Sequence, residues 1–217
     1  MILTVIGNTG SFPGPDAPAS CYLLSGEDAD GRTWRIVLDM GNGALGVLQR
    51  HIDLHEIDAI MLSHLHPDHC VDVGGLHVAV KWDPRGWQGG CIPIYGPSML
   101  HGYLNQLHLL PPEHSMDTEF DFHVWQANQP VTVGPFTVTP HPVYHPCPEP
   151  YALRVEYRRQ LVEIAALDVT AEDPVATLPE TAAALADLAG AALEATLFES
   201  GRPVLLAPAM ASGAGPA

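Results

Sequence analysis

The stretch MLSHLHPDHC, residues 61–70, constrains this chain more than any other part of it, because it places four side chains of the metal-ligand type within six positions. They are His64, His66, Asp68 and His69. The apolar run IDAIMLS at 57–63 precedes them and predicts a buried strand. An extended backbone turns His64 and His66 to the same side, and Pro67 then changes the direction of the chain. The four side chains can therefore face one cavity from a strand-to-helix loop.

Metal binding explains this spacing better than a histidine-rich surface loop does. Two imidazoles suit zinc and similar transition metals, and the added carboxylate and third imidazole indicate a second ion beside the first. A surface loop has no reason to place Ser-His-x-His-x-Asp-His directly after a buried strand. The stretch therefore predicts one or two metal ions, with zinc expected and manganese or iron as alternatives.

The order of apolar runs indicates the fold class. Several short strands come before and between single helices, with too few crossovers for a doubly wound parallel sheet, so we expect a mixed or antiparallel sheet pair flanked by helices. The strands are expected at 3–7, 21–25, 34–39, 57–63, 91–96, 120–126, 136–140 and 151–157, and the helices at 43–52, 70–82, 97–107 and 178–195. With 217 residues, 47% of them hydrophobic, the chain is expected to form one domain, 1–217, with 205–217 as a flexible tail.

Three segments together resemble the metallo-β-lactamase fold superfamily. Residues 64–69 match its H-x-H-x-D-H motif, residues 4–24 are similar to the opening hairpin of its ribonuclease Z-like and phosphodiesterase-like branch, and VLDMGNGAL at 37–45 is similar to that branch's L-D-x-G-x-G turn. The resemblance extends from residue 1 to about residue 157. It implies an α/β (α+β) fold, an αββα sandwich of two mixed β-sheets flanked by helices, with a di-metal hydrolase site at one sheet edge.

The resemblance implies that the first metal is held by three histidines. Two of them are His64 and His66, and the third is expected in a loop just before a strand. TPHPVYHPCPEPYALRV at 139–155 offers His145, which precedes an aromatic-led strand as in the family, and His141 as the alternative.

The resemblance implies that the second metal is held by Asp68, His69 and a bridging aspartate. Asp168 in VEIAALDVTAED is the counterpart of the bridging residue, and a strand-ending or capping role is its alternative. The family's later histidines have no counterpart, because Ala209 stands where one would be and no histidine follows His145. We therefore expect a second site completed by water and a divergent or truncated C-terminus.

These assignments predict a metal-dependent hydrolase. A bound metal lowers the pKa of water from 15.7 to about 7, and the resulting hydroxide, oriented by Asp68 as catalytic residue, would attack a small phosphodiester or related ester. The alternative is a catalytically impaired metal-binding or interaction protein that retains the fold. A further alternative is ribonuclease Z-like processing of RNA.

Charge limits the partners of this chain. Twenty-five acidic and nine basic residues give a net charge of -16, which argues against nucleic acid and against anionic membranes, so we expect a small-molecule substrate. The absence of a basic signal region and of a run of ~18 apolar residues predicts a cytoplasmic protein. An uncovered sheet edge near the divergent C-terminus would favour a homodimer.

Two smaller features complete the sequence-based expectations. No C-x-x-C pair occurs, so we expect reduced, buried thiols at Cys21, Cys70, Cys91 and Cys147. DPRGWQGG at 83–90 predicts a surface loop with one packed tryptophan, with a substrate-facing loop as the alternative.

Overall fold

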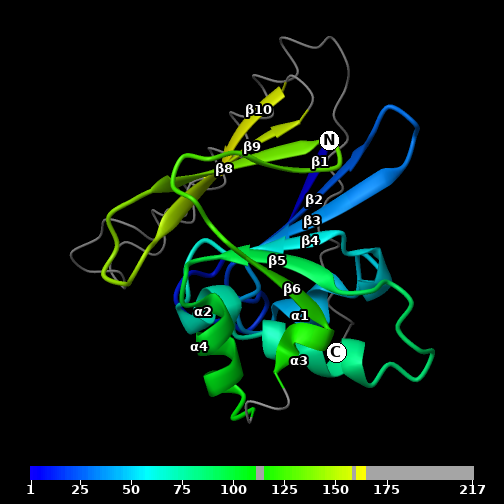
Figure 1. Cartoon of the computed structure of the whole chain (residues 1–217), viewed down its shortest axis with the longest axis vertical. Coiled ribbons are helices and arrows are strands. Elements are labelled where there is room, and N and C mark those ends of the chain that lie inside the picture. The colour runs from blue at the N-terminus through cyan, green and yellow to red at the C-terminus, as the bar shows by residue number, and fades with distance from the viewer. Residues whose placement is uncertain (111–114, 158–159, 165–217) are drawn as a thin grey trace, which may run out of the picture.

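Two stacked β-sheets, with helices on the outer face of the larger one, form the described part of the molecule (Figure 1). The computed structural model describes residues 1–110, 115–157 and 160–164. In the larger sheet, neighbours follow chain order: β1 (Ile2–Gly7), β2 (Cys21–Glu27), β3 (Thr33–Leu38), β4 (Ala59–Met61), β5 (Ile92–Gly96) and β6 (Phe120–Val124). The first three strands are antiparallel and β3 to β6 are parallel.

The smaller sheet is antiparallel throughout its described strands. In sheet order these are β10 (Gln160–Ile164), β9 (Tyr151–Tyr157), β8 (Phe136–Pro142) and β7 (Val131–Val133). The helices are α1 (Ala44–Leu48), α2 (Pro67–Cys70), α3 (Val73–Lys81) and α4 (Leu100–Leu107), with single 3-10 turns at η1 (Leu54–Glu56) and η3 (Met116–Thr118). None of the helices in these ranges is long and apolar enough to cross a membrane.

The larger sheet buries side chains on both of its faces, which explains the consecutive apolar residues in its central strands. Successive residues of a strand point to opposite faces. In β3, Val37 packs toward the helices, whereas Ile36 and Leu38 pack toward the smaller sheet. A sheet covered on both faces needs apolar residues at consecutive positions. The chain therefore builds two cores, one on each side of this sheet.

A buried indole joins the larger sheet to the core between the sheets. Trp125 directly follows β6, is 3% exposed and packs in that core. Its Nε1 donates a hydrogen bond of 2.9 Å to the carbonyl oxygen of Leu62, the residue after β4. This bond fixes the backbone two residues before His64.

The sandwich of sheets flanked by helices confirms the predicted fold, and the eight predicted strands are found. The helix predicted over 70–82 is divided into α2 and α3, because the backbone N–H of Asp72 donates to the carbonyl oxygen of Met40 (3.0 Å) instead of continuing one helix. Strands β7 and β10 were not predicted. The helix predicted over 178–195 and the tail at 205–217 lie outside the described residues.

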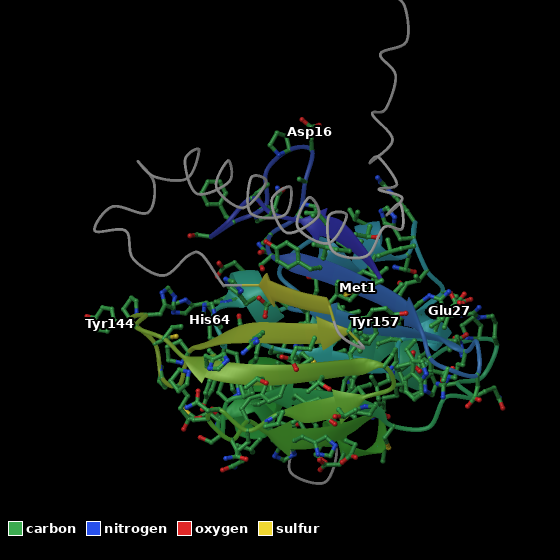
Figure 2. All side chains as sticks on the ribbon, turned by 90° about the horizontal axis from the view of Figure 1, so that it is seen from above. Met1, Asp16, Glu27, His64, Tyr144 and Tyr157 are labelled. Carbon is green, nitrogen blue, oxygen red and sulfur yellow. The ribbon has the colours of Figure 1, made fainter. Side chains whose placement is uncertain are left out.

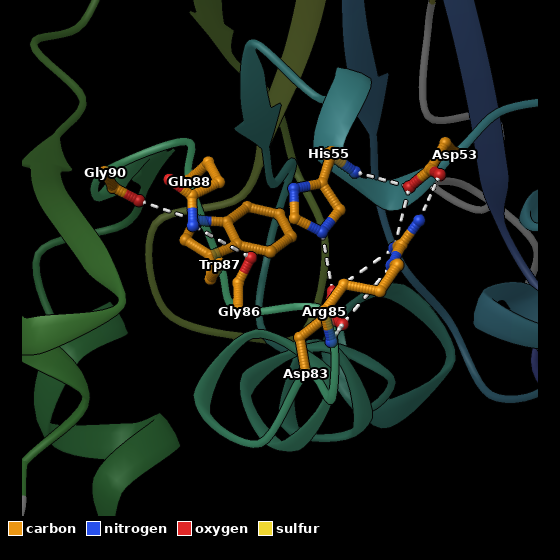
Figure 3. A network of polar contacts seen from close by, with 8 residues as sticks. All are labelled: Asp53, His55, Asp83, Arg85, Gly86, Trp87, Gln88 and Gly90. Atoms are coloured by element: carbon orange, nitrogen blue, oxygen red, sulfur yellow. Dashed lines mark hydrogen bonds and ion pairs between the residues drawn. The ribbon is translucent and has the colours of Figure 1, made fainter.

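The loop after α3 is held against η1 by a polar network (Figure 3). Its members are Asp53, His55, Asp83 and Arg85. The Trp87 ring stacks on His55 with 4.3 Å between ring centroids, and its Nε1 donates to the Gly90 carbonyl oxygen at 2.8 Å. Trp82 is 73% exposed. These contacts confirm a surface loop with one packed tryptophan.

Candidate metal centre

The histidine stretch begins where parallel strand β4 ends, at the carboxyl edge of the sheet where sites in α/β folds commonly lie. The N–H of Leu62 donates to the Tyr95 carbonyl oxygen (2.8 Å), and the N–H of Tyr151 donates to the Ser63 carbonyl oxygen (3.0 Å). The second bond ties the start of β9 to the residue before His64. Figure 2 shows His64 toward the same side of the molecule as Tyr144. The loop that carries Tyr144 is therefore brought to the histidines.

Helix α2 turns the second half of the stretch inward. His66 has an extended backbone before Pro67, and proline is favoured at the first position of a helix. The carbonyl oxygens of Asp68 and His69 accept hydrogen bonds from the N–H groups of Ser20 (3.1 Å) and Met40 (2.7 Å). Both side chains are buried, at 7% and 3% exposure. Hydrogen bonds from the opening hairpin, through Ser20, and from the L-D-x-G-x-G turn, through Met40, thus hold α2 in place.

Four donor atoms converge beside this loop. The group consists of His64, His66, His145 and Cys147, whose ligand atoms all lie within 4.8 Å of one another. His66 Nδ1 and His145 Nε2 are 3.0 Å apart. The His64 ring centroid lies 4.8 Å from that of His66 and 4.7 Å from that of His145. Imidazole nitrogens and a thiol in this arrangement are a donor set that transition metals prefer.

The hydrogen bonds of Ser63 determine which nitrogen of His64 is available to a metal. The Ser63 hydroxyl donates to Asp39 Oδ2 (2.9 Å), so its oxygen accepts from His64 Nδ1 (3.1 Å). His64 Nε2 then carries the lone pair. It is buried and has no hydrogen-bond partner among the described residues. Burial, followed by the nearby His69, lowers the pKa of His64 to about 3, which keeps the ring neutral as a metal ligand must be.

Asp39 is a buried carboxylate that accepts hydrogen bonds from several residues around the loop of His64. Its carboxylate accepts from the Ser63 N–H (2.8 Å), from the Ser20 hydroxyl (3.2 Å) and from His69 Nδ1 (2.7 Å). Burial on its own would raise the pKa of Asp39, but His69 and these donors hold it below its ordinary value. Asp39 has φ +57°, the left-handed region, which redirects the chain after β3. Carboxylates that orient metal-binding imidazoles in this way tune the metal site.

Sequence comparison identifies the family. Residues 34–187 match the model of the beta-lactamase superfamily domain. The chain belongs to the β-lactamase superfamily. An uncharacterized protein of Mycobacterium tuberculosis is 40% identical over 155 residues, which cover 70% of this chain and 54% of that protein. The probable metallo-hydrolase YhfI of Bacillus subtilis is 32% identical over 158 residues, covering 71% and 59%. The chain thus spans about half the length of the curated relatives it matches.

Solved structures agree with this β-lactamase superfamily fold. The crystal structure of YhfI superposes with a TM-score of 0.58 at 32% identity, covering 71% of this chain and 58% of that one. The short form of human tRNase Z gives a TM-score of 0.60 over 87% and 88% of the two chains. Its identity of 19% shows a shared fold alone.

The structure brings together some of the site residues that the sequence predicted. His145 lies with His64 and His66, whereas His141 Nδ1 lies 2.8 Å from Asn128 Oδ1, outside the cluster. His69 Nε2 lies 3.3 Å from Asp68 Oδ2, beside the group of four donors. Asp168 lies outside the described residues.

The sequence reasoning missed Asp39 and Cys147. Asp39 could have been found from its place at the end of a buried strand, inside the L-D-x-G-x-G turn. Cys147 was expected to be buried, and this is wrong for it and for Cys91, which are half-buried and exposed. All four cysteines are free. Burial raises the pKa of Cys70 to about 12, and its thiol donates to the His66 carbonyl oxygen at 3.3 Å.

A cavity of about 490 Å³ lies apart from this centre. Its lining includes Met1, Glu27, Arg35 and Tyr157, and none of the four donor residues. In Figure 2 Glu27 stands at the opposite side of the molecule from Tyr144 and His64, with Met1 and Tyr157 between them. This cavity is therefore not part of the candidate metal centre.

Proposed function

We propose that this chain is a metal-dependent hydrolase that acts on a small phosphodiester or related ester, with zinc as its metal. The observation that carries the proposal is the convergence of His64, His66 and His145, together with a His64 Nε2 that is buried and lacks a hydrogen-bond partner among the described residues. A buried nitrogen without a hydrogen-bond partner lowers the stability of the folded state by about 1–3 kcal/mol, and a bound metal would remove this cost. The residues present therefore fit a metal ion.

The metal would supply a water that ionises near neutral pH, because zinc lowers the pKa of a bound water to about 7. In the chain, His64, His66 and His145 would hold the ion. Asp68 is a buried carboxylate beside them and would accept the proton and orient the nucleophile. Asp39 would fix the orientation of His69, which would serve a second ion with Asp68.

A small substrate suits the charge of the chain. With nine basic and twenty-five acidic residues, little positive charge is available to follow a nucleic-acid backbone. A single phosphodiester or ester needs only the metal and a few polar groups. The name of YhfI, a probable metallo-hydrolase, supports the reaction class. The likeness to human tRNase Z extends to the fold, and we do not infer RNA processing from it.

A second candidate function is metal binding without catalysis. The fourth donor, Cys147, favours it, because four protein ligands close a tetrahedral zinc site whereas a catalytic site keeps one position open. The two candidates predict the same metal content and differ in turnover.

The test combines metal content with turnover. The chain is purified without added metal, its zinc, manganese and iron are measured per chain, and hydrolysis of bis(p-nitrophenyl) phosphate, a cyclic nucleotide, p-nitrophenyl acetate and a lactone is followed. His64→Ala is expected to abolish both metal binding and turnover. His141→Ala is the matched control, since its ring contacts Asn128 outside the cluster, and it should leave both unchanged. Full turnover in His64→Ala would sink the proposal, and metal without turnover would favour the second candidate.

A further inference from the structure

We propose that Cys147 is a fourth protein ligand of the metal held by His64, His66 and His145. The inference rests on the metal centre of the proposed function and adds a donor that the sequence pattern does not contain. Cys147 Sγ lies within 4.8 Å of the ligand atoms of all three histidines. In a tetrahedral zinc site with bonds of about 2.0–2.3 Å, ligand atoms lie roughly 3.3–3.8 Å apart. The widest pair of ligand atoms therefore has to move closer by only about 1 Å, which a side-chain rotation can supply.

The backbone presents His145 and Cys147 together. The N–H of Cys147 donates to the carbonyl oxygen of His145 at 2.7 Å, which makes a tight turn between the two residues. The ends of this loop are also fixed, because the N–H of Val143 donates to the Pro150 carbonyl oxygen at 3.1 Å. A thiol on a loop that is tied at both ends loses little conformational freedom when it binds a metal.

A second contact anchors the same loop to the helix side of the molecule. The carboxylate of Glu149 accepts hydrogen bonds from the N–H of Ser98 (2.6 Å) and from its hydroxyl (2.7 Å). Ser98 lies in the turn between β5 and α4. The loop that carries Cys147 is thus positioned by two separate elements, and its approach to His64 does not depend on the cysteine.

An independent observation points to a ligand at this place. His64 is 1% exposed, its Nε2 is buried without a hydrogen-bond partner among the described residues, and this side chain belongs to the group that contains Cys147 Sγ. The cysteine therefore does not stand alone, because it lies beside an imidazole whose buried, unpartnered Nε2 a metal would bind.

The thiol differs in kind from the three histidines, and this difference has consequences. When the metal–sulfur bond forms, the thiol proton passes to the buffer and no oxidation occurs. Thiolate ligands favour zinc, cobalt and other thiophilic ions over manganese and magnesium, which prefer oxygen ligands. Three imidazoles and a thiolate also fill a tetrahedral site, so Cys147 has to leave the metal before another group can take its position.

The first test uses cobalt as a spectroscopic replacement for zinc in the full chain. Wild type and Cys91→Ser are expected to show a thiolate-to-cobalt charge-transfer band in the near ultraviolet. Cys147→Ser is expected to bind cobalt without this band, with an affinity lower by at least about 10–100-fold, the range seen even for groups behind a metal ligand. Cys91 is the matched control because it is an exposed free cysteine outside the donor group.

The outcomes distinguish a failure of Cys147 as a ligand from a failure of the whole metal centre. If Cys147→Ser holds cobalt with the wild-type spectrum and affinity, the cysteine is no ligand, while the three-histidine site stands. If the wild-type chain binds no cobalt, the metal centre fails and the fourth ligand fails with it.

The second test needs no variant. Iodoacetamide labelling of the wild-type chain is followed at each cysteine by mass spectrometry, with and without zinc. Zinc is expected to protect Cys147 and to leave the labelling rate of Cys91 unchanged. Equal labelling of Cys147 with bound zinc would overturn the proposal.

Discussion

Asp39 Oδ2 lies 2.7 Å from His69 Nδ1, and this contact decides which nitrogen of His69 faces the metal side. A carboxylate only accepts hydrogen bonds, so Nδ1 is the donor and Nε2 keeps its lone pair in the neutral ring. Nε2 lies 3.3 Å from Asp68 Oδ2. Two electron-rich atoms in this relation are suited to a cation between them, which is the place proposed for a second ion.

Asp39→Asn is expected to weaken the second metal position. The amide can donate to His69 Nδ1, which moves the ring proton to Nε2 and blocks that nitrogen. Asparagine tolerates the left-handed backbone of residue 39, so the fold is retained. We expect a loss of about 10–100-fold in affinity for the weaker ion, measured by chelator competition and elemental analysis. Asp121→Asn, at an exposed carboxylate on β6, is the control, and equal affinities in both variants would contradict the assignment.

Gly41→Ala is expected to displace the α2 loop. A Cβ at Gly41 would lie 1.8 Å from the backbone carbonyl oxygen of Asp68, and backbone cannot yield as a side chain does. The expected cost is about 1–3 kcal/mol of unfolding free energy, with loss of metal binding. Gly46→Ala is the control, because a Cβ there meets nothing within 4 Å on an exposed face of α1, and it should stabilise by about 0.5–1 kcal/mol. Denaturant unfolding compares the two, and equal stability would refute the clash.

Trp125→Phe tests the bond between β6 and the start of the histidine stretch. The ring remains in the core between the sheets, but the Leu62 carbonyl oxygen loses its 2.9 Å donor. Leaving a buried acceptor unsatisfied costs about 1–3 kcal/mol, which chemical denaturation measures. Trp82→Phe should change stability by less than about 0.5 kcal/mol, since that side chain is 73% exposed. Similar losses at both positions would show that the bond contributes nothing.

The Arg85 network predicts a pH dependence of stability. Hydrogen bonds from Arg85 lower the pKa of Asp53 to about 2, against about 3.9 in an unfolded chain. Because the folded pKa is depressed, the stabilisation is present above roughly pH 4 and is lost as the pH falls toward 2. The difference in thermal midpoint between wild type and Arg85→Ala should therefore be constant above pH 4, shrink below it, and shrink also in high salt. A difference independent of pH would show that the ion pairs do not carry it.

The sequence by itself determined the local chemistry of this protein. Short runs of apolar residues predict the strands, and the spacing of His64 and His66 before Pro67 predicts a donor-bearing loop, because both depend on neighbours in the chain. Those patterns correctly predicted the two sheets, and they left His141 and His145 as alternatives for the third metal ligand.

Only the tertiary structure decided which distant side chains join the loop. His66 and His145 are 79 positions apart, and no local period says that His145 meets His66 while His141 turns to Asn128. Cys147 enters the group through the turn that it shares with His145. Asp39 reaches His69 because the N–H of the next residue, Met40, donates to the His69 carbonyl oxygen, while the N–H of Ser20 donates to that of Asp68. The physical reason is that hydrogen bonds and packing between segments far apart in the chain, and not sequence proximity, set these distances.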